Sequence, residues 1–309
     1  MYDTPILFII FNRPNQTQQV FDEIKKQKPK QFFIAADGPR NNHEQDIKLC
    51  KATRAIIDQI DWECEIKTLF SEVNLGCGLA PATAITWFFE HVEEGIILED
   101  DCVPNISFFT FCADLLARYK KNENIKMISG TSFQPTSLEK DTYYFSKYPH
   151  VWGWATWRRA WTEYNFDLKQ ECEQERETVI GKTFKNKREQ KMWRNNMNMI
   201  ISGLDAWDYQ FMYWMWKNEG ICITPWRNLI SNIGFGSQAT HTHNTNSSQS
   251  AMEQFEIGEI KHPKVIGINK KADQYERYTI LLEPQYQHFY NRTKSIFKRI
   301  KGILFLKNE

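Results

Sequence analysis

The first half of the chain alternates short apolar runs with stretches of helical periodicity. The apolar runs have the length of a strand rather than a helix, and they cover residues 5–11, 31–36, 65–70, 95–98 and 125–129. Apolar residues recur at helical spacing between these runs, over residues 16–27, 46–59, 80–93 and 107–121. Such alternation predicts an α/β fold, in which a mostly parallel central sheet carries helices on both faces.

The second half of the chain has a different pattern. Residues 143–161 are rich in Trp and Tyr, and residues 167–198 are a charged stretch with helical spacing and a candidate break at Gly181. Residues 206–219 (AWDYQFMYWMWKNE) predict an aromatic helix, and residues 221–223 predict a short strand. We therefore expect this half to add aromatic surface to the predicted sheet.

Polar and turn-forming residues follow all five predicted strands of the first half. The segments at these ends read FNRP, ADGPR, SEVNLGCG, LEDD and SGTS. The carboxyl ends of parallel strands meet at one edge of a sheet, where open α/β folds bind their ligands. The sequence thus predicts a ligand site at this edge.

Three consecutive carboxylates, Glu99, Asp100 and Asp101, end the fourth predicted strand. No Lys or Arg lies between His91 and Arg118 to neutralise them, and Asn105 is already placed to cap the following helix. Hard cations such as Mn²⁺ and Mg²⁺ prefer carboxylate oxygens and complete their shell with phosphate oxygens. We favour a bound divalent cation over a cluster of salt bridges.

Other strand ends offer groups for a nucleotide. Arg13 follows the first strand and suits a phosphate, although it also fits a surface charge; Asp37 suits a base N–H or simply the Asp-Gly-Pro turn. Asn74 and Gly76 precede a helix in a glycine-containing segment where backbone can approach a ligand closely. The P-loop lysine is absent from this segment.

These strand ends resemble the GT-A fold of nucleotide-sugar glycosyltransferases. The likeness rests on FNRP, ADGPR, NLGCG and ILEDD, and it continues through PHVWGWATWRRAW (149–161), AWDYQF (206–211) and NLISNIGFGSQATHT (228–242). The EDD variant is similar to that of certain N-acetylglucosaminyltransferases, and the later segments resemble bacterial family-2-like glycosyltransferases. The resemblance covers roughly residues 5–243.

The resemblance implies a division of the chain into three parts. Residues 1–130 would be the nucleotide-sugar-binding half, and residues 131–243 the acceptor-binding and catalytic half of the same domain. Residues 244–309 would be a C-terminal extension with a basic amphipathic helix.

The resemblance also implies a role for each strand-end residue. Asp101 would be the direct ligand of Mn²⁺ or Mg²⁺, while Glu99 and Asp100 would contact the donor sugar and the ribose. Arg13 would meet the diphosphate, and Asp37 would accept a hydrogen bond from uracil.

The catalytic base is implied in the segment AWDYQF. Asp208 directly follows Trp207 and is the preferred base, but Asp205 would share its helix face and remains the alternative. In the loop after residue 228, His241 is a candidate metal ligand and His243 a weaker one.

Most tryptophans are expected in the core. Trp152 and Trp154 are the two chosen to stack on a sugar, because they flank Gly153, where the backbone could come near the donor.

Composition limits the partners and the compartment. The net charge of +1 gives no global field that favours nucleic acid. The seven cysteines form no CxxC pair, and the sequence shows neither a signal peptide nor a membrane-spanning apolar stretch, which indicates a cytoplasmic protein. Residues 286–307 read as a basic amphipathic helix, suited equally to an anionic membrane at the inner face of the cell membrane or to the protein's own core.

The sequence therefore predicts a metal-dependent glycosyltransferase. It would transfer a sugar from a UDP-sugar, such as UDP-GlcNAc or another hexose donor, to a hydroxyl of a glycan or lipid-linked glycan that serves as a surface-glycan precursor, with inversion. Two alternatives remain: a sugar-nucleotide nucleotidyltransferase, which normally has a Gly-rich, basic loop after the first strand, and a non-catalytic carbohydrate-binding protein.

Overall fold

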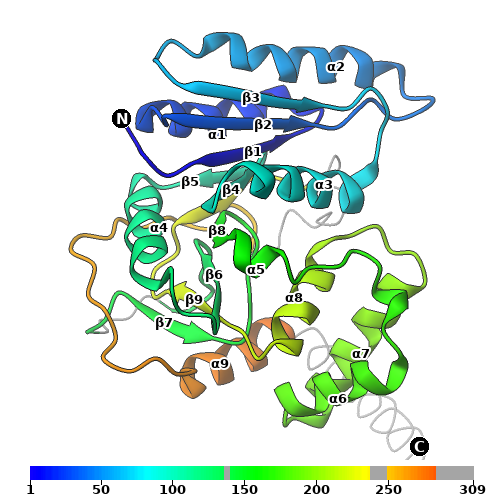
Figure 1. Cartoon of the computed structure of the whole chain (residues 1–309), viewed down its shortest axis with the longest axis vertical. Helices are drawn as coiled ribbons and strands as arrows, with labels where there is room; N and C mark the ends of the chain where they lie inside the picture. The colour runs from blue at the N-terminus through cyan, green and yellow to red at the C-terminus, as the bar shows by residue number, and fades with distance from the viewer. Residues whose placement is uncertain (136–139, 237–248, 283–309) are drawn as a thin grey trace, which may run out of the picture.

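A computed structural model describes residues 1–135, 140–236 and 249–282. His241, His243 and the basic segment 286–307 lie outside these residues, so their predicted roles stay predictions. The described chain forms one large mixed sheet with helices on both faces and a small two-stranded sheet beside it (Figure 1). This confirms the predicted α/β class with a mostly parallel, Rossmann-like arrangement.

The parallel part of the sheet comes from the first half of the chain. Strands β1 (Ile6–Ile10), β2 (Gln31–Ala36), β3 (Glu65–Phe70) and β4 (Glu94–Glu99) lie in the order β3-β2-β1-β4. All three neighbouring pairs are parallel. The carboxyl ends of β1 and β4 are therefore adjacent, as the alternating pattern predicts.

The other half of the sheet is mixed. Beyond β4 follow β8 (Trp154–Trp157), β6 (Ile125–Ser129), β9 (Ile221–Pro225) and β7 (Tyr143–Ser146). Strand β8 runs antiparallel to both β4 and β6, and β7 runs antiparallel to β9. The sequence pattern did not predict β7 or β8, because both are four-residue segments without alternation inside an aromatic stretch.

Helices cover both faces because the central strands are apolar on both sides. On β1, Ile6, Phe8 and Ile10 pack into one cluster of buried side chains, and Leu7 and Ile9 pack into another. Helices α1 (Pro14–Gln27) and α4 (Ile106–Tyr119) contribute to the first cluster, whereas α3 (Gly76–His91) and α8 (Asp208–Lys217) contribute to the second. Most of the buried aromatic side chains pack in these two clusters.

Several helix boundaries differ from the sequence prediction. Helix α3 starts at Gly76, so Pro81 lies inside the helix rather than in its first turn. The charged stretch breaks between α6 (Glu173–Thr183) and α7 (Lys187–Ile201), where Asn186 caps α7, and not at Gly181. Asn105 caps α4 through the backbone N–H of Ser107, as predicted.

The remaining helical segments are short, or lie at the rim of the sheet. They are α2 (Glu44–Arg54), α5 (Arg158–Trp161), α9 (Lys270–Glu276), the 3₁₀ turns Ala55–Gln59 and Leu168–Gln170, and a π-helical turn at Arg277–Leu281. In the part of the chain that the structure describes, no helix combines the length and the apolar character needed to cross a bilayer.

A two-stranded sheet brings distant segments to the end of β4. Strand β5 (Cys102–Pro104) directly follows the three acids and pairs antiparallel with β10 (Ile230–Asn232). The backbone N–H of Ile233 donates to the carbonyl oxygen of Asp101 at 2.8 Å. The described segment after β10 therefore lies beside the acids.

Candidate functional site

Four carboxylates gather at the carboxyl end of β4. Glu99 is the last residue of β4, Asp100 and Asp101 form the turn into β5, and Asp208 is the first residue of α8. The charge of Asp208 acts on Glu99 together with the charges of Asp100 and Asp101. We call these four residues the acid cluster.

Arg13 is the counter-charge of Asp100 and Asp101 in the acid cluster. One guanidinium nitrogen, Nη1, lies 2.7 Å from Oδ2 of Asp101 and 3.4 Å from Oδ1 of Asp100. The apparent lack of a basic partner in the sequence is thus corrected: the partner is 87 to 88 residues away along the chain, and the adjacency of β1 and β4 brings it close. Arg13 sits directly before α1.

Burial and repulsion between neighbouring acids disfavour the ionised forms of Glu99 and Asp100. Burial raises the pKa of Glu99 to about 8, with further contributions from the charges of Asp101, Asp100 and Asp208. Burial also raises the pKa of Asp100 to about 7, with Asp101 adding to the rise and Arg13 opposing it. Ionising Glu99 and Asp100 is therefore costly in the folded protein, and added positive charge at the site would favour their ionised forms.

The acid cluster suits a hard divalent cation by the chemistry of its donors. The carboxylate oxygens of Asp101 and Glu99 are the ligand type that Mn²⁺ and Mg²⁺ prefer, and such ions take only one or two carboxylates when phosphate oxygens supply the rest. Within the described residues, no group of three or more His, Cys, Asp or Glu side chains is arranged to hold a metal. A cation held by the described acids would need further ligands, such as phosphate oxygens, to complete its shell.

Gly234 closes one side of the acid cluster. A Cβ atom at this position would lie 1.9 Å from Oδ2 of Asp101, so only glycine allows the backbone to pack on that carboxylate. Phe235 follows, and its ring lies edge-on to Trp152 at 5.7 Å between ring centroids. The first two residues of the GFG motif therefore have distinct local roles. Gly234 leaves room for the Asp101 carboxylate, and Phe235 places an aromatic side chain near the acids.

Asp37 and Asp205 share one task at the start of α3. The first four N–H groups of a helix have no partner inside it. Asp37 accepts from the N–H of Leu75 and of Gly76 at 2.9 and 3.1 Å. Asp205 accepts from the N–H groups of the next two residues, Cys77 and Gly78, both at 2.9 Å. Two carboxylates from outside the helix thus satisfy its amino terminus.

These contacts correct the role predicted for Asp37. Its carboxylate also accepts from the N–H of Gly38 at 2.8 Å and from Nδ2 of Asn74 at 2.8 Å, which gives two hydrogen bonds to each oxygen. A carboxylate offers about four lone-pair sites, so these four donors fill them. Asp37 and Asn74 therefore hold the start of α3, and this arrangement does not favour Asp37 as the acceptor for uracil.

The predicted role of Gly76 in ligand approach is corrected for the same reason. Gly76 has φ of +87°, and a Cβ atom there would lie 2.3 Å from Oδ2 of Asp205. The glycine makes room for this carboxylate and not for a ligand, and the amide groups that could have bound phosphate are already used.

The two predicted bases, Asp205 and Asp208, have different surroundings. Asp205 precedes α8 and binds the start of α3, whereas Asp208 begins α8 and faces the acid cluster. The sequence placed both on one face of one helix, and the structure shows that this was wrong. Of the two predicted bases, the geometry favours Asp208.

The two tryptophans predicted to stack on a sugar also have different surroundings. Trp154 is fully buried on β8 and packs against Trp207 and Phe211, so it belongs to the core and cannot stack on a sugar. Gly153 has φ of +61°, and a Cβ atom there would lie 2.4 Å from Cδ1 of Ile230, so its close neighbour is a protein side chain. Trp152 is only half-buried and stays a candidate.

Sequence reasoning missed the neighbours of Trp152. Phe133 lies edge-on to Trp152 at 5.9 Å between ring centroids, and Phe235 also lies edge-on to it, at 5.7 Å. Both phenylalanines are half-buried. Each phenylalanine follows a short Gly- or Ser-containing segment after a strand, in SGTSF and in GFG. These segments could have indicated an aromatic side chain at the edge of the sheet. We call Phe133, Trp152 and Phe235 the aromatic row.

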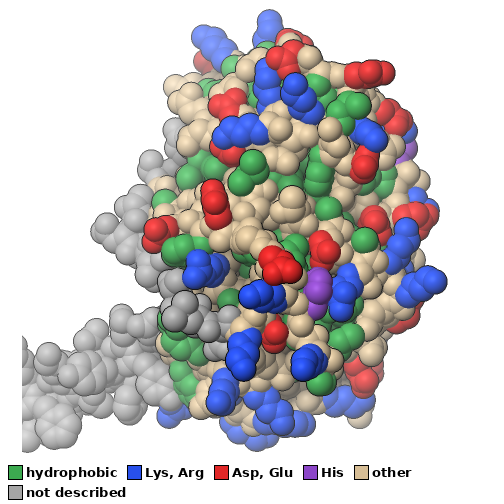
Figure 2. All heavy atoms as spheres, turned by 90° about the vertical axis from the view of Figure 1, so that its left-hand side faces the viewer, with side chains coloured by type: hydrophobic (Ala, Val, Ile, Leu, Met, Phe, Trp, Pro, Cys, Tyr) green, Lys and Arg blue, Asp and Glu red, His purple; other side chains and the backbone are tan. Residues whose placement is uncertain are grey.

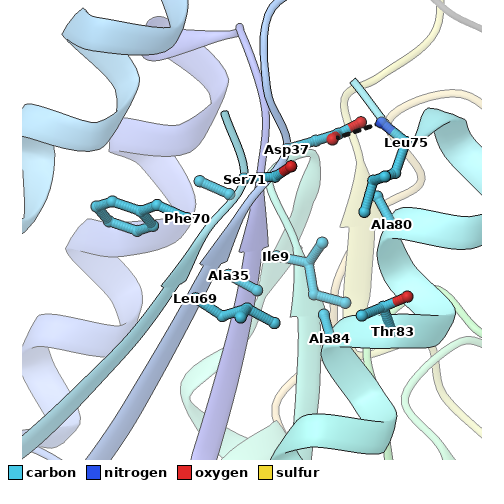
Figure 3. Close-up of a pocket in the computed structure, with 11 residues that line it drawn as sticks. Ile9, Ala35, Asp37, Leu69, Phe70, Ser71, Leu75, Ala80, Thr83 and Ala84 are labelled. Atoms are coloured by element: carbon cyan, nitrogen blue, oxygen red, sulfur yellow. Dashed lines mark hydrogen bonds between the residues drawn. The ribbon is translucent and has the colours of Figure 1, made fainter. Parts of the chain in front are cut away.

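A small apolar pocket lies between the sheet and α3. It measures about 190 Å³ and is formed by the ends of β1, β2 and β3 together with α3, with Asp37 and Leu75 at one end (Figure 3). Its walls are mostly aliphatic, including Ile9, Leu69 and Ala84. The Asp37–Leu75 hydrogen bond lies across this end, so the pocket is bounded by the double carboxylate cap of α3.

The fold and the strand-edge acids define a Rossmann-like α/β protein with a polar site at the carboxyl edge of its sheet. No protein-family profile and no curated protein matches the sequence. Among solved structures, the chain is similar to HddC from Yersinia pseudotuberculosis, with 8% identity, a TM-score of 0.33, and coverage of 54% of this chain and 82% of that chain.

Two further solved structures have names that refer to nucleotide chemistry. One is 4-diphosphocytidyl-2C-methyl-D-erythritolsynthase from Anaerococcus prevotii, with 10% identity, a TM-score of 0.30, and coverage of 62% of this chain and 84% of that chain. The other is UDP-glucose pyrophosphorylase in its apo form, with 9% identity, a TM-score of 0.36, and coverage of 75% and 93%. These TM-scores are all below 0.5, so the similarity does not identify an activity.

Proposed function

We propose that this protein is a metal-dependent glycosyltransferase of GT-A type that uses a UDP-sugar as donor. The observation that carries the proposal is the acid cluster: Asp100 and Asp101 pair with Arg13, and burial with the charges of Asp101, Asp100 and Asp208 raises the pKa of Glu99 beside them. A divalent cation bound here would supply positive charge and use the acids as ligands, and the oxygens of a nucleoside diphosphate would complete its shell.

Arg13 has a specific part in this proposal. Its guanidinium is bound to Asp101 and Asp100. A bound Mn²⁺ or Mg²⁺ would supply Lewis-acid stabilisation of the departing diphosphate. The guanidinium of Arg13 would leave Asp101 and bind phosphate oxygens instead, because phosphate and carboxylate both accept two hydrogen bonds from a guanidinium. Glu99 and Asp100 remain on the side of the donor sugar and the ribose.

Asp208 is the proposed general base. It begins α8 beside Glu99, and a carboxylate in such a position can take the proton of an acceptor hydroxyl as that oxygen attacks the anomeric carbon. Attack from the side opposite the diphosphate inverts the anomeric centre. Phe235 of the half-buried aromatic row follows Gly234, which packs on Asp101, and Trp152 beside it is the proposed aromatic surface for an acceptor sugar.

The rival activity, sugar-nucleotide nucleotidyl transfer, requires a different segment after the first strand. That reaction is expected to use a Gly-rich, basic loop after β1. Here β1 ends at Ile10 and α1 begins at Pro14, so Phe11, Asn12 and Arg13 are the whole connection. This connection is too short to wrap a triphosphate, and we rank the rival below the transferase.

Calorimetric titration with UDP, with and without Mn²⁺, tests the proposal. We expect binding that requires the metal, and metal-independent or absent binding would overturn it. A panel of UDP-sugars assayed for slow donor hydrolysis then identifies the sugar. An assay for pyrophosphate exchange with a nucleoside triphosphate and a sugar 1-phosphate separates the rival activity, since a transferase gives no signal there.

A further inference from the structure

A loop that runs into the first turn of α9 exposes aliphatic side chains among lysines. Residues 261–271 read KHPKVIGINKK, and we call them the lysine–aliphatic loop. Val265 is 76% exposed, Ile266 is 45% exposed and Ile268 is 41% exposed. Three neighbouring aliphatic residues at such exposure in one short segment have no role in the core, and they indicate a surface that contacts something apolar.

All charged side chains of the lysine–aliphatic loop are basic. Lys261, Lys264, Lys270 and Lys271 are all exposed, and the loop contains neither Asp nor Glu. None of these four ammonium groups forms an ion pair with another described residue. Basic side chains also gather at the lower end of the face shown in Figure 2, the end at which Figure 1 places α9.

The loop is held in place at both ends. At its start, the backbone N–H of Lys261 donates to Oγ1 of Thr142 at 2.8 Å, and the N–H of Thr142 donates to the Lys261 carbonyl at 2.8 Å. At its end, the N–H of Asn269 donates to the carbonyl of Phe145 on β7 at 2.8 Å, and the Asn269 side chain caps α9. The exposed side chains are therefore presented by an anchored backbone, which lowers the entropy lost on binding.

Helix α9 anchors the loop further through buried acids. Asp273 accepts from Oγ of Ser146 at 2.7 Å, and Glu276 lies 2.9 Å from Nε2 of His150. Both carboxylates are almost fully buried. Because α9 is fixed on its inner side, its outer side and the preceding loop form a stable platform.

We propose that the lysine–aliphatic loop binds the surface of an anionic phospholipid bilayer. Val265 and Ile266 would enter the boundary between headgroups and acyl chains, and the four lysines would contact lipid phosphates and carboxylates. Charge complementarity favours a bilayer over a second copy of this chain, since a second copy presents the same basic loop. The proposal is independent of the transferase activity and uses residues other than the basic segment 286–307.

Flotation of the full chain with vesicles tests this. Vesicles of phosphatidylcholine with about one third phosphatidylserine should bind the protein, and vesicles of phosphatidylcholine alone should bind it far less. Reversing two lysines, Lys264→Glu with Lys270→Glu, should lower partitioning at least tenfold, because each basic residue at an anionic surface contributes about fivefold. Val265→Ser with Ile266→Ser should lower it as well, and added salt should not rescue that variant.

A matched control uses exposed residues elsewhere. Ile47 and Lys48 are exposed on α2, at the opposite end of the molecule in Figure 1, so Ile47→Ser with Lys48→Glu should leave partitioning unchanged. The conservative pair Lys264→Arg with Lys270→Arg should keep binding. Thermal unfolding of every variant confirms that these surface changes leave the fold intact.

Three outcomes would overturn the proposal. Wild-type protein that does not float with anionic vesicles removes the lipid as partner. Equal partitioning of wild type and the loop variants assigns binding to another surface, such as 286–307. A wild-type dimer that the Val265→Ser, Ile266→Ser variant converts to a monomer, with vesicle binding unchanged, assigns the loop to self-association.

Discussion

Nη1 of Arg13 lies 2.7 Å from Oδ2 of Asp101, and this pair joins the ends of two adjacent parallel strands. Both side chains are 15% exposed, so the pair is largely withdrawn from water. The pair neutralises part of the acid cluster and holds Asp101 in position beside Gly234. It is also the contact that a metal-bound diphosphate would have to rearrange.

Removal of Arg13 should destabilise the protein and weaken donor binding together. Breaking a largely buried ion pair by removing one partner typically costs about 3 kcal/mol or more. We expect Arg13→Ala to lower the free energy of unfolding by this order in urea titrations at neutral pH, and Mn²⁺ to restore part of it. Arg13→Lys keeps the charge and should lose less stability; equal loss in both variants would contradict a mainly electrostatic role.

The stability of the protein should fall as the pH rises through the range in which Glu99 and Asp100 ionise. The pKa of Glu99 is raised from its ordinary 4.5 to about 8, so the folded state binds this proton more tightly than the unfolded chain does. Its contribution to stability is therefore full below about pH 4.5 and is lost as the pH approaches 8. Asp100, with its pKa raised to about 7, acts in the same direction.

Glu99→Gln provides the matched control for this pH dependence. The amide cannot ionise, so the fall in unfolding free energy between pH 5 and pH 8 should become shallower in this variant. Mn²⁺ together with UDP should also flatten the wild-type profile, since added positive charge stabilises the ionised acids. A profile that is the same in wild type and variant would place the pH dependence elsewhere.

Asp101 is expected to carry the metal dependence of nucleotide binding. Asp101→Asn keeps the size of the side chain and removes its charge, so calorimetry should show UDP affinity that no longer responds to Mn²⁺. Gly234→Ala should have a similar effect by a steric route, because its methyl group would collide with Oδ2 of Asp101. Unchanged metal response in Asp101→Asn would move the cation to other ligands.

Asp208 and Asp205 should give opposite results. Asp208→Asn should bind UDP normally and transfer sugar at least about a hundredfold more slowly, the usual contribution of a general base. Asp205→Ala should keep sugar transfer but lose roughly 1 kcal/mol of unfolding free energy, the typical contribution of a helix cap. Activity retained in Asp208→Asn and lost in Asp205→Asn would reverse the assignment made from the structure.

Asp37 should behave as a structural residue. Asp37→Asn replaces one acceptor oxygen by an NH₂ group that faces the N–H donors of Leu75 or Gly76, or the amide of Asn74. We expect a lower midpoint of thermal unfolding and little change in the preference for UDP over CDP. A switch in base preference without loss of stability would instead support contact with uracil.

The first half of the fold was readable from the sequence because its elements are local and regular. Strands β1, β2 and β4 contain continuous apolar runs, and helix α1 buries Val20, Phe21 and Ile24 on one face. Strands β7 and β8 escaped prediction because four-residue segments carry too little pattern, and their place in the sheet depends on partners far along the chain.

The candidate site could be located from the sequence but not resolved into roles. Chain order placed Arg13, Asp37 and the three acids at one sheet edge, since parallel strands share a direction. It could not show that Asp37 and Asp205 take the amide groups of α3, because hydrogen bonds across 38 to 128 residues depend on how the helices pack.

The sequence by itself determined the α/β class, the edge at which polar residues collect and the identity of the acids that gather there. Only the tertiary structure decided which carboxylates cap a helix and which form the acid cluster. Asp37 and Asp205 cap α3, while Asp100 and Asp101 pair with Arg13 and lie near Glu99. The physical reason is that hydrogen bonds and charge repulsion act over a few ångströms in space, and packing alone sets those distances.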